Sequence, residues 1–208
     1  MQINNIKYYF CTISVLIMMI GLLMWRTDGF SSYTYESNRR SSIQDKPVEV
    51  SDWKLQNSRN EMTSLSSFEE GLLLVDFIYT RCPTVCRALG SRYSQLQTLI
   101  DANPSSDIKL LSISIDPEFD TPSRLKLYQQ AHKGNEESWD LARPINQITL
   151  DNILKETGVR VIPDEIWGFA HSDSIHVIQN GLLTSIKNWD SSDLDSLIQR
   201  NLKLEPSS

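Results

Sequence analysis

Hydrophobic residues fall into blocks along the chain that alternate between strand and helix patterns. The run Leu72–Ile78 is nearly continuous in apolar residues, as expected for a strand that is covered on both faces. Apolar positions then recur at helical spacing through residues 85–100, and a second buried strand is expected over residues 108–115. This βαβ order brings the carboxyl ends of two parallel strands to one edge of a sheet, where ligands usually bind.

The later blocks predict three helices and a hairpin. A helix capped by Asp120 or Thr121 follows the second strand, and another is expected over residues 150–157. Apolar runs on either side of Asn180-Gly181 predict a β-hairpin, because this dipeptide favours a tight turn between strands. A final amphipathic helix is expected near the carboxyl end of the chain.

The amino-terminal segment from Tyr8 to Trp25 is almost wholly apolar. As a helix it would span roughly 27 Å, which is close to the thickness of a hydrocarbon core. We therefore expect residues 1–26 to form an uncleaved membrane anchor and the polar, serine-rich residues 27–50 to form a tether. A cleaved signal peptide is the alternative, although no small-residue cleavage site follows the apolar run. Cys11 lies within this run and is expected to be a buried apolar thiol.

Cys82 and Cys86 stand four positions apart, directly after the first buried strand. If both were helical, their Cβ atoms would lie roughly 5–6 Å apart, whereas a disulfide needs about 3.5–4.5 Å. The pair can bond reversibly only if Cys82 lies in the loop before the helix and Cys86 in its first turn, which Pro83 favours. Such a pair suits a redox switch or a two-thiolate metal site. Its place between the first buried strand and the helix predicts an α/β domain with a thioredoxin-like fold.

The chemistry of the pair favours a soft metal. A thiolate at a helix amino terminus is stabilised by unpaired backbone N–H groups, and two thiolates select Cu(I), with zinc as the competitor. The chain has three histidines. His132 is expected to cap a helix or lie at the surface, His176 is expected at a surface or edge position of a strand, and His171 lies in the loop before the hairpin. Two cysteines and one histidine are too few for a structural zinc site with four protein ligands.

The charge of the chain excludes one class of partner. The formal net charge is -6, and no stretch gathers lysine and arginine on one face. A nucleic-acid-binding domain would carry such a basic face. We therefore expect no nucleic-acid partner.

Three blocks of the sequence resemble the Sco/SenC family of copper chaperones, which serve assembly of the CuA centre of cytochrome c oxidase. They are residues 77–86, with the sequence FIYTRCPTVC; residues 114–122, with the sequence SIDPEFDTP; and His171-Ser172 before the hairpin. The blocks occur in the order found in the family. Together with the expected anchor and tether, the resemblance extends over most of the chain.

The resemblance implies a thioredoxin-like Sco/SenC domain over residues 51–204, followed by a tail over residues 205–208. It implies copper bound by Cys82, Cys86 and His171, with Asp116 beside the site. It also implies a single-pass protein of the cytoplasmic (inner) membrane whose soluble domain faces the periplasm. The expected partners are the copper-bearing subunit of cytochrome c oxidase or another copper protein, and a protein that reduces the thiols.

Two other functions stay open. The protein could be a thiol-disulfide oxidoreductase that uses Cys82 and Cys86 as a redox pair on the cysteines of a copper protein. It could also be a copper-sensing or redox-sensing module. A metal carrier is the first interpretation, so enzymatic activity is not assigned from the sequence.

The chain departs from the family pattern at two positions. Arg87 follows the second cysteine, where a proline is common, and Ala170 precedes the histidine, where an aspartate is common. Arg87 favours thiolates but repels an approaching cation. The missing carboxylate beside His171 removes one group that could orient the ring. Neither change removes a metal ligand.

Overall fold

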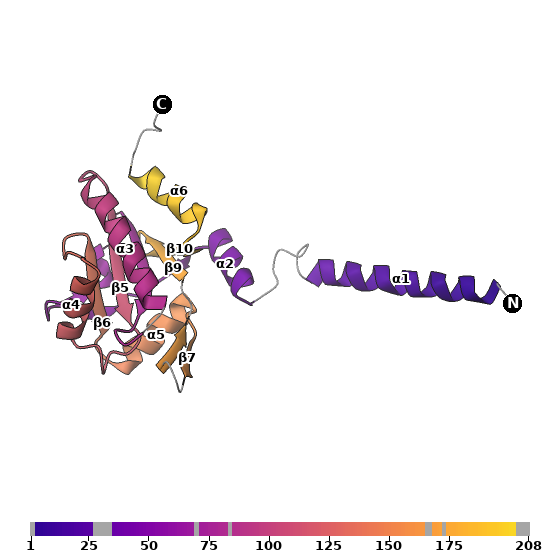
Figure 1. The fold of residues 1–208 in the computed structure, drawn as a ribbon, viewed down its shortest axis with the longest axis horizontal. Coiled ribbons are helices and arrows are strands. Elements are labelled where there is room, and N and C mark those ends of the chain that lie inside the picture. The colour runs from indigo at the N-terminus through magenta and orange to yellow at the C-terminus, as the bar shows by residue number, and fades with distance from the viewer. Residues whose placement is uncertain are drawn as a thin grey trace, which may run out of the picture. The chain divides into compact units, whose positions relative to one another are not determined.

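The computed structural model describes residues 3–26, 35–68, 71–82, 85–164, 168–171 and 174–202. The chain divides into two compact units, residues 1–45 and residues 46–208. The first unit contains the helices α1 (Ile3–Arg26) and α2 (Tyr35–Asp45) (Figure 1). Among the described residues, no helix combines the length and the apolar character needed to cross a membrane.

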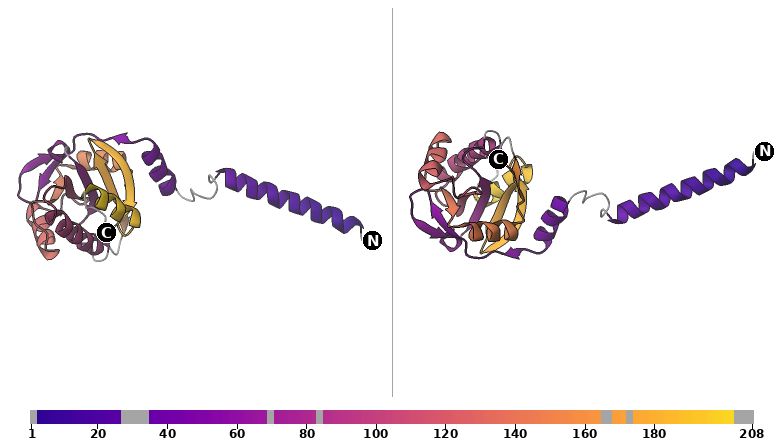
Figure 2. Two further views of the ribbon diagram at one scale, coloured as in Figure 1. Left: turned by 90° about the horizontal axis from the view of Figure 1, so that it is seen from above. Right: turned by 90° about the horizontal axis from the view of Figure 1, so that it is seen from below.

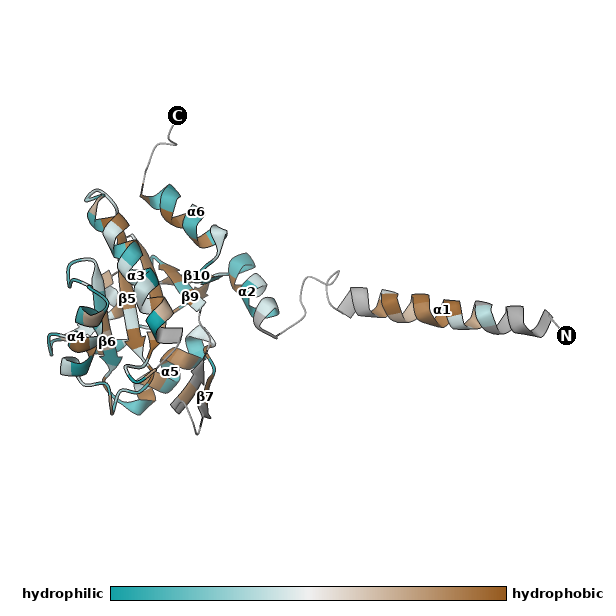
Figure 3. Cartoon of the chain, in the orientation of Figure 1, coloured by the Kyte–Doolittle hydropathy of each residue, from teal (hydrophilic) through white to brown (hydrophobic). Residues whose placement is uncertain are grey.

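Regular structure extends into the segment expected to be a tether. No element is expected from the sequence in residues 27–50, yet α2 and the strand β1 (Val48–Glu49) lie there. The helix has no apolar stripe, so its spacing carries no helical signal, and it is coloured mostly as polar in Figure 3. The strand β1 pairs with a later strand of the folded domain, which therefore begins before residue 51.

The second unit is built on one large sheet, seen from two sides in Figure 2. Its order is β1-β10-β9-β4-β5-β6-β2-β3. Only the pairs β4-β5 and β5-β6 are parallel, and the other neighbours are antiparallel. Besides β1, its strands are β2 (Lys54–Asn57), β3 (Met62–Ser64), β4 (Leu72–Ile78), β5 (Ile108–Ser114), β6 (Trp139–Pro144), β9 (Ser174–Gln179) and β10 (Leu182–Asn188).

In the described part of the second unit, four α-helices and a short 3-10 helix, η1 (Leu65–Phe68), accompany this sheet. The helix α3 contacts β5, α4 contacts β6 and β2, α5 contacts β6, and α6 contacts β10. All seven residues of β4 are buried, which confirms the prediction of a strand covered on both faces. The α-helices are α3 (Val85–Asp101), α4 (Pro122–Ala131), α5 (Gln147–Thr157) and α6 (Ser192–Asn201).

The hairpin and the βαβ unit agree with the sequence patterns. Asn180 and Gly181 have φ values of 53° and 73°, the left-handed conformations that a two-residue turn between strands requires. They connect β9 to β10. The parallel pairing of β4 with β5 puts the loops after Ile78 and Ser114 at the same edge of the sheet.

Other features of the second unit were also not expected from the sequence. The strand β6 was missed, because its short sequence WDLARP mixes buried apolar residues with two charged ones and a proline. A separate two-stranded antiparallel sheet was also missed, formed by β7 (Val161–Asp164) and β8 (Gly168–His171). His171 was expected in a loop, and this prediction is wrong because the backbone of His171 pairs with Val161 at the end of β8.

Candidate functional site

Cys82 lies in the loop that follows β4, and Cys86 is the second residue of α3. The backbone N–H of Cys82 donates a hydrogen bond to the carbonyl oxygen of Tyr79 at 3.1 Å, which closes a tight turn. Cys82 is largely buried, with 9% of the residue exposed. One cysteine before the helix and one in its first turn is the arrangement that the spacing predicts. The side chains of Cys86 and His171, two of the three predicted ligands, lie outside the described part of the structure.

A buried carboxylate holds the cysteine loop. Asp120 accepts hydrogen bonds from the backbone N–H of Thr80 at 3.1 Å and from the Thr80 hydroxyl at 2.5 Å. It also accepts one from the hydroxyl of Ser114 at 2.6 Å, at the end of β5. Burial raises the pKa of Asp120, and these hydrogen bonds oppose the shift because they favour the ionised form. Asp120 thus ties the loop after β4 to the loop after β5.

The helix-capping prediction misses this role of Asp120. Thr121, the other candidate, is the residue that stands at the N-cap of α4. A carboxylate before a proline-initiated helix looks like a capping group in the sequence. Its partner Thr80 lies forty residues earlier in the chain, and only the convergence of the two loops at one sheet edge gives a signal for this pairing.

Asp116 contacts the residue that precedes Cys82. Its carboxylate accepts a hydrogen bond from Nη2 of Arg81 at 2.5 Å, and 13% of the Asp116 side chain is exposed. The Arg81 guanidinium also lies over the ring of Phe119, 3.9 Å from its centroid. The structure therefore brings Asp116 to the cysteine loop, through a basic group rather than through a described contact with a thiol.

The strand that carries His171 lies against the end of β4. The hydroxyl of Tyr79 donates a hydrogen bond to the carbonyl oxygen of Phe169 at 2.9 Å. The two rings also meet edge to face, with centroids 5.5 Å apart and an interplanar angle of 86°. Tyr79 is three residues before Cys82, and Phe169 is two residues before His171. This contact joins the β7-β8 sheet to the cysteine loop.

The other two histidines have structural roles. His132 is the C-cap of α4, and its Nδ1 lies 2.9 Å from the carbonyl oxygen of Tyr128, which confirms the capping prediction. The prediction of a surface or edge position for His176 is wrong, because this residue is fully buried in β9. The strand lies between β4 and β10, and the His176 ring meets Phe77 edge to face at 5.3 Å. Alternation along a strand cannot reveal that both of its faces are covered.

The described side chains alone do not complete a metal site. Among them, no group of three or more His, Cys, Asp or Glu residues is placed to hold an ion.

Another carboxylate precedes the cysteine loop in the sequence but lies inside the core. Asp76 is fully buried in β4, and burial raises its pKa to about 7, while its interaction with Ser112 on β5 opposes the shift.

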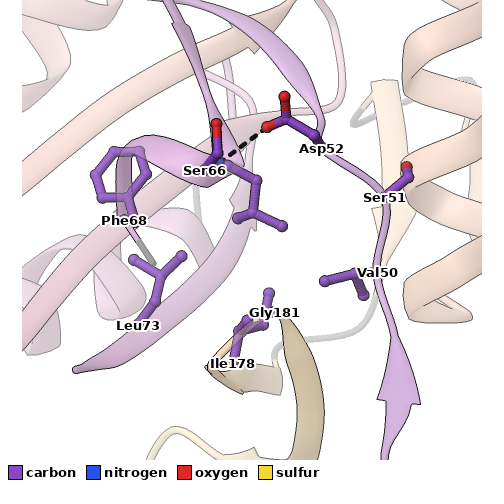
Figure 4. Close-up of a pocket in the computed structure, with 9 residues that line it drawn as sticks. Val50, Ser51, Asp52, Ser66, Phe68, Leu73, Ile178 and Gly181 are labelled. Atoms are coloured by element: carbon purple, nitrogen blue, oxygen red, sulfur yellow. Dashed lines mark hydrogen bonds between the residues drawn. The ribbon is translucent and has the colours of Figure 1, made fainter. Parts of the chain in front are cut away.

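A small cavity of about 60 Å³ lies at the other end of β4 (Figure 4). It is lined by residues around Leu73, Ile178 and Gly181, and the Asp52 carboxylate at its rim accepts a hydrogen bond from the backbone N–H of Ser66 at 2.9 Å. The lining contains no cysteine and no histidine. The cavity therefore contributes nothing to the chemistry of the cysteine pair.

Comparison with known proteins places this fold among the mixed α/β, thioredoxin-like proteins of the Sco type. The profile of the SCO1/SenC family matches residues 41–138. A SCO1 protein homolog from Bacillus subtilis (strain 168) is 30% identical over 132 residues, which are 62% of this chain and 68% of the relative. The chain therefore belongs to the SCO1/SenC family.

Solved structures show the same fold. The structure of BsSco, described as a member of the Sco family of cytochrome c oxidase assembly proteins with a disulfide switch, is 25% identical and has a TM-score of 0.65. The match covers 77% of this chain and 96% of BsSco. Bradyrhizobium japonicum ScoI with copper bound is 18% identical, with a TM-score of 0.62 and coverage of 74% of this chain and 99% of ScoI.

Proposed function

We propose that this protein is a copper chaperone that binds Cu(I) through Cys82, Cys86 and His171. The observation that carries the proposal is the hydrogen bond from Tyr79 to Phe169, because it joins the strand of His171 to the loop of Cys82. Residues almost ninety positions apart in the sequence thereby belong to one local structure. Membership of the SCO1/SenC family supports the same ligand set.

The donor set fits the metal. Two thiolates and one imidazole are soft ligands, and three of them suit Cu(I) better than zinc, which takes four ligands in structural sites. The start of α3 favours the thiolate form of the pair, because the first N–H groups of a helix have no partner within it. Asp116 offsets the charge of Arg81, which would otherwise repel a cation near Cys82.

Copper is the cargo in this proposal, and a respiratory oxidase is the recipient. We assign delivery to the CuA centre of cytochrome c oxidase, since BsSco is described as a cytochrome c oxidase assembly protein.

We also propose that residues 1–26 attach the chain to the cytoplasmic membrane and that the folded domain faces the periplasm. The apolar run in α1 supports this attachment. Membrane fractionation, with and without residues 1–26, tests it.

Anaerobic titration of the reduced full-length protein with Cu(I) tests the ligand set. One copper ion per chain is expected, and Cys82→Ser, Cys86→Ser and His171→Ala should each weaken binding strongly. His132→Ala is the matched control, because this histidine caps α4 and should leave binding unchanged. The proposal fails if the three ligand variants bind copper as tightly as the parent protein.

Thiol-disulfide exchange is a second candidate, favoured by the position of the cysteines on either side of the helix start. In this reaction a cysteine thiolate attacks a substrate disulfide, one substrate sulfur leaves as a thiolate, and the second cysteine resolves the mixed disulfide. The substrate is reduced and the pair is oxidised. Reduction of a disulfide substrate should then require both cysteines and be insensitive to His171→Ala.

A further inference from the structure

A basic groove opens beside Cys82. It has a volume of about 590 Å³ and lies between the cysteine loop, the start of α3, the loop after β5 and α4. Three arginines line it, namely Arg81, Arg87 and Arg124, and none of the ten lining residues is acidic. The chain as a whole has a formal net charge of -6, so the charge of the groove lining is opposite in sign to the net charge of the chain.

Two of these arginines are held in place by one aromatic ring. The guanidinium carbons of Arg81 and Arg124 lie 3.9 and 3.5 Å from the centroid of the Phe119 ring. Arg124 also donates a hydrogen bond from Nη1 to the carbonyl oxygen of Phe119 at 2.9 Å. A guanidinium that stacks on a ring keeps its N–H edges for planar acceptors such as carboxylates. Arg81 already donates one of its N–H groups to the carboxylate of Asp116, so Arg87 and Arg124 are the arginines that the groove offers to the carboxylates of a partner.

The groove also offers an apolar surface. Leu127 on α4 is 64% exposed, although most large apolar residues of this domain are buried. It lies next to Tyr128 in the sequence, and both residues line the groove. A partner segment that combines carboxylates with an apolar side chain would match both properties of this surface.

We propose that this groove binds an acidic polypeptide segment of the protein that exchanges copper or thiols with Cys82. The inference rests on the proposed function, because it identifies the chemistry of the recipient. A polypeptide is favoured over an anionic membrane surface because the groove is recessed and contains Cys82, whose exchange partner must reach the thiol with its own ligands. Carboxylates that pair with the arginines would orient that partner over Cys82.

The test measures binding of a fluorescent, cysteine-free peptide with alternating glutamate and leucine residues to the full-length protein in detergent. The same peptide with glutamine in place of glutamate is the control. We expect the glutamate peptide to bind more tightly at low salt and to lose this advantage at high salt. Arg124→Gln should weaken its binding about tenfold, and Arg124→Glu should weaken it further. Lys126→Gln removes a charge from the same helix outside the groove and should change binding little.

Two measurements separate this inference from the copper proposal. Arg124→Gln should leave the Cu(I) stoichiometry and the unfolding midpoint close to those of the parent protein, so a loss of peptide binding is not a loss of fold. If copper binding is absent but the peptide still binds through Arg124, the copper proposal fails and the groove assignment stands. Equal affinity for the two peptides overturns the groove assignment. The groove assignment would also be overturned if binding of phosphatidylglycerol vesicles depended on Arg124 and binding of the peptide did not.

Discussion

Tyr79 and Phe169 meet twice, once through a hydrogen bond of 2.9 Å from hydroxyl to carbonyl oxygen and once through an edge-to-face contact of their rings. The first residue belongs to the loop of the cysteine pair and the second to the strand that carries His171. These two contacts join the strand of His171 to the cysteine loop.

Tyr79→Phe removes the hydrogen bond and keeps the ring contact. We expect a loss of stability of about 1 kcal/mol and weaker Cu(I) binding, because the strand of His171 is then less firmly positioned. Competition against a Cu(I) chelator measures the affinity, and urea unfolding measures the stability. Tyr93→Phe is the matched control, since the Tyr93 hydroxyl makes no hydrogen bond to any described residue. Equal copper affinities for Tyr79→Phe and the parent protein would contradict the positioning role of Tyr79.

Asp120→Asn weakens the link between the loops after β4 and β5. The carboxylate accepts three hydrogen bonds, from the Thr80 amide, the Thr80 hydroxyl and the Ser114 hydroxyl, whereas an amide group has only one acceptor oxygen. We expect a loss of about 1–3 kcal/mol, because a buried donor is left unsatisfied. Asp193→Asn on α6 is the control, since its carboxylate is 77% exposed and its ion pair with Lys187 is long, at 3.9 Å. A loss in the control as large as in Asp120→Asn would show that the hydrogen bonds from Thr80 and Ser114 to Asp120 are not the cause.

Asp76 makes the stability of the metal-free protein depend on pH. Its pKa is raised by burial from 3.8 to about 7, so between these values the folded state keeps a proton that the unfolded state has released. The contribution of Asp76 to stability is therefore largest below the lower value and falls as the pH rises toward about 7, by at most about 4 kcal/mol. Asp76→Asn should remove this slope. Urea unfolding at several pH values between pH 4 and pH 7 tests it. A difference in the free energy of unfolding between the two proteins that stays constant over this range would refute the prediction.

Gly90 allows α3 and α4 to approach. A Cβ atom at this position would lie 2.5 Å from Cδ2 of His132 and 2.6 Å from its Nε2. We expect Gly90→Ala to lower the free energy of unfolding by about 1–3 kcal/mol through this overlap. The double variant Gly90→Ala, His132→Ala should recover part of the loss, because the imidazole is no longer present. A double-mutant cycle measures the coupling, and additive effects would show that the two residues do not collide.

Much of the fold follows from hydrophobic spacing. The continuous apolar run of β4, the helical stripe of α3 and the Asn180-Gly181 turn each have one local cause, and each is found where the sequence predicts it. The strand β6 is different, since its charged and proline residues conceal a strand that forms because β5 and β2 flank it. Local patterns cannot reveal such an element, because its stability comes from its neighbours.

Some residues of the candidate site are likewise evident from the sequence, and others are not. Cys82 and Cys86 are evident from their spacing, and Asp116 follows from the shared edge of two parallel strands. The link from Tyr79 to Phe169 and the pairing of Asp120 with Thr80 are not evident, because each joins residues at least forty positions apart. Single-sequence reasoning has no signal for contacts that depend on how loops converge.

The β7-β8 sheet has a consequence for what copper does to the protein. A two-stranded sheet is marginally stable alone, so contacts with its surroundings must hold it. A copper ion shared by Cys82, Cys86 and His171 would then be a cross-link between two sheets and would close a long loop of the chain, much as a disulfide does. Copper binding would make the β7-β8 sheet more rigid, and transfer of the copper to a recipient would make it more flexible again. The rigidity of the surface that a partner contacts would thus depend on whether copper is bound.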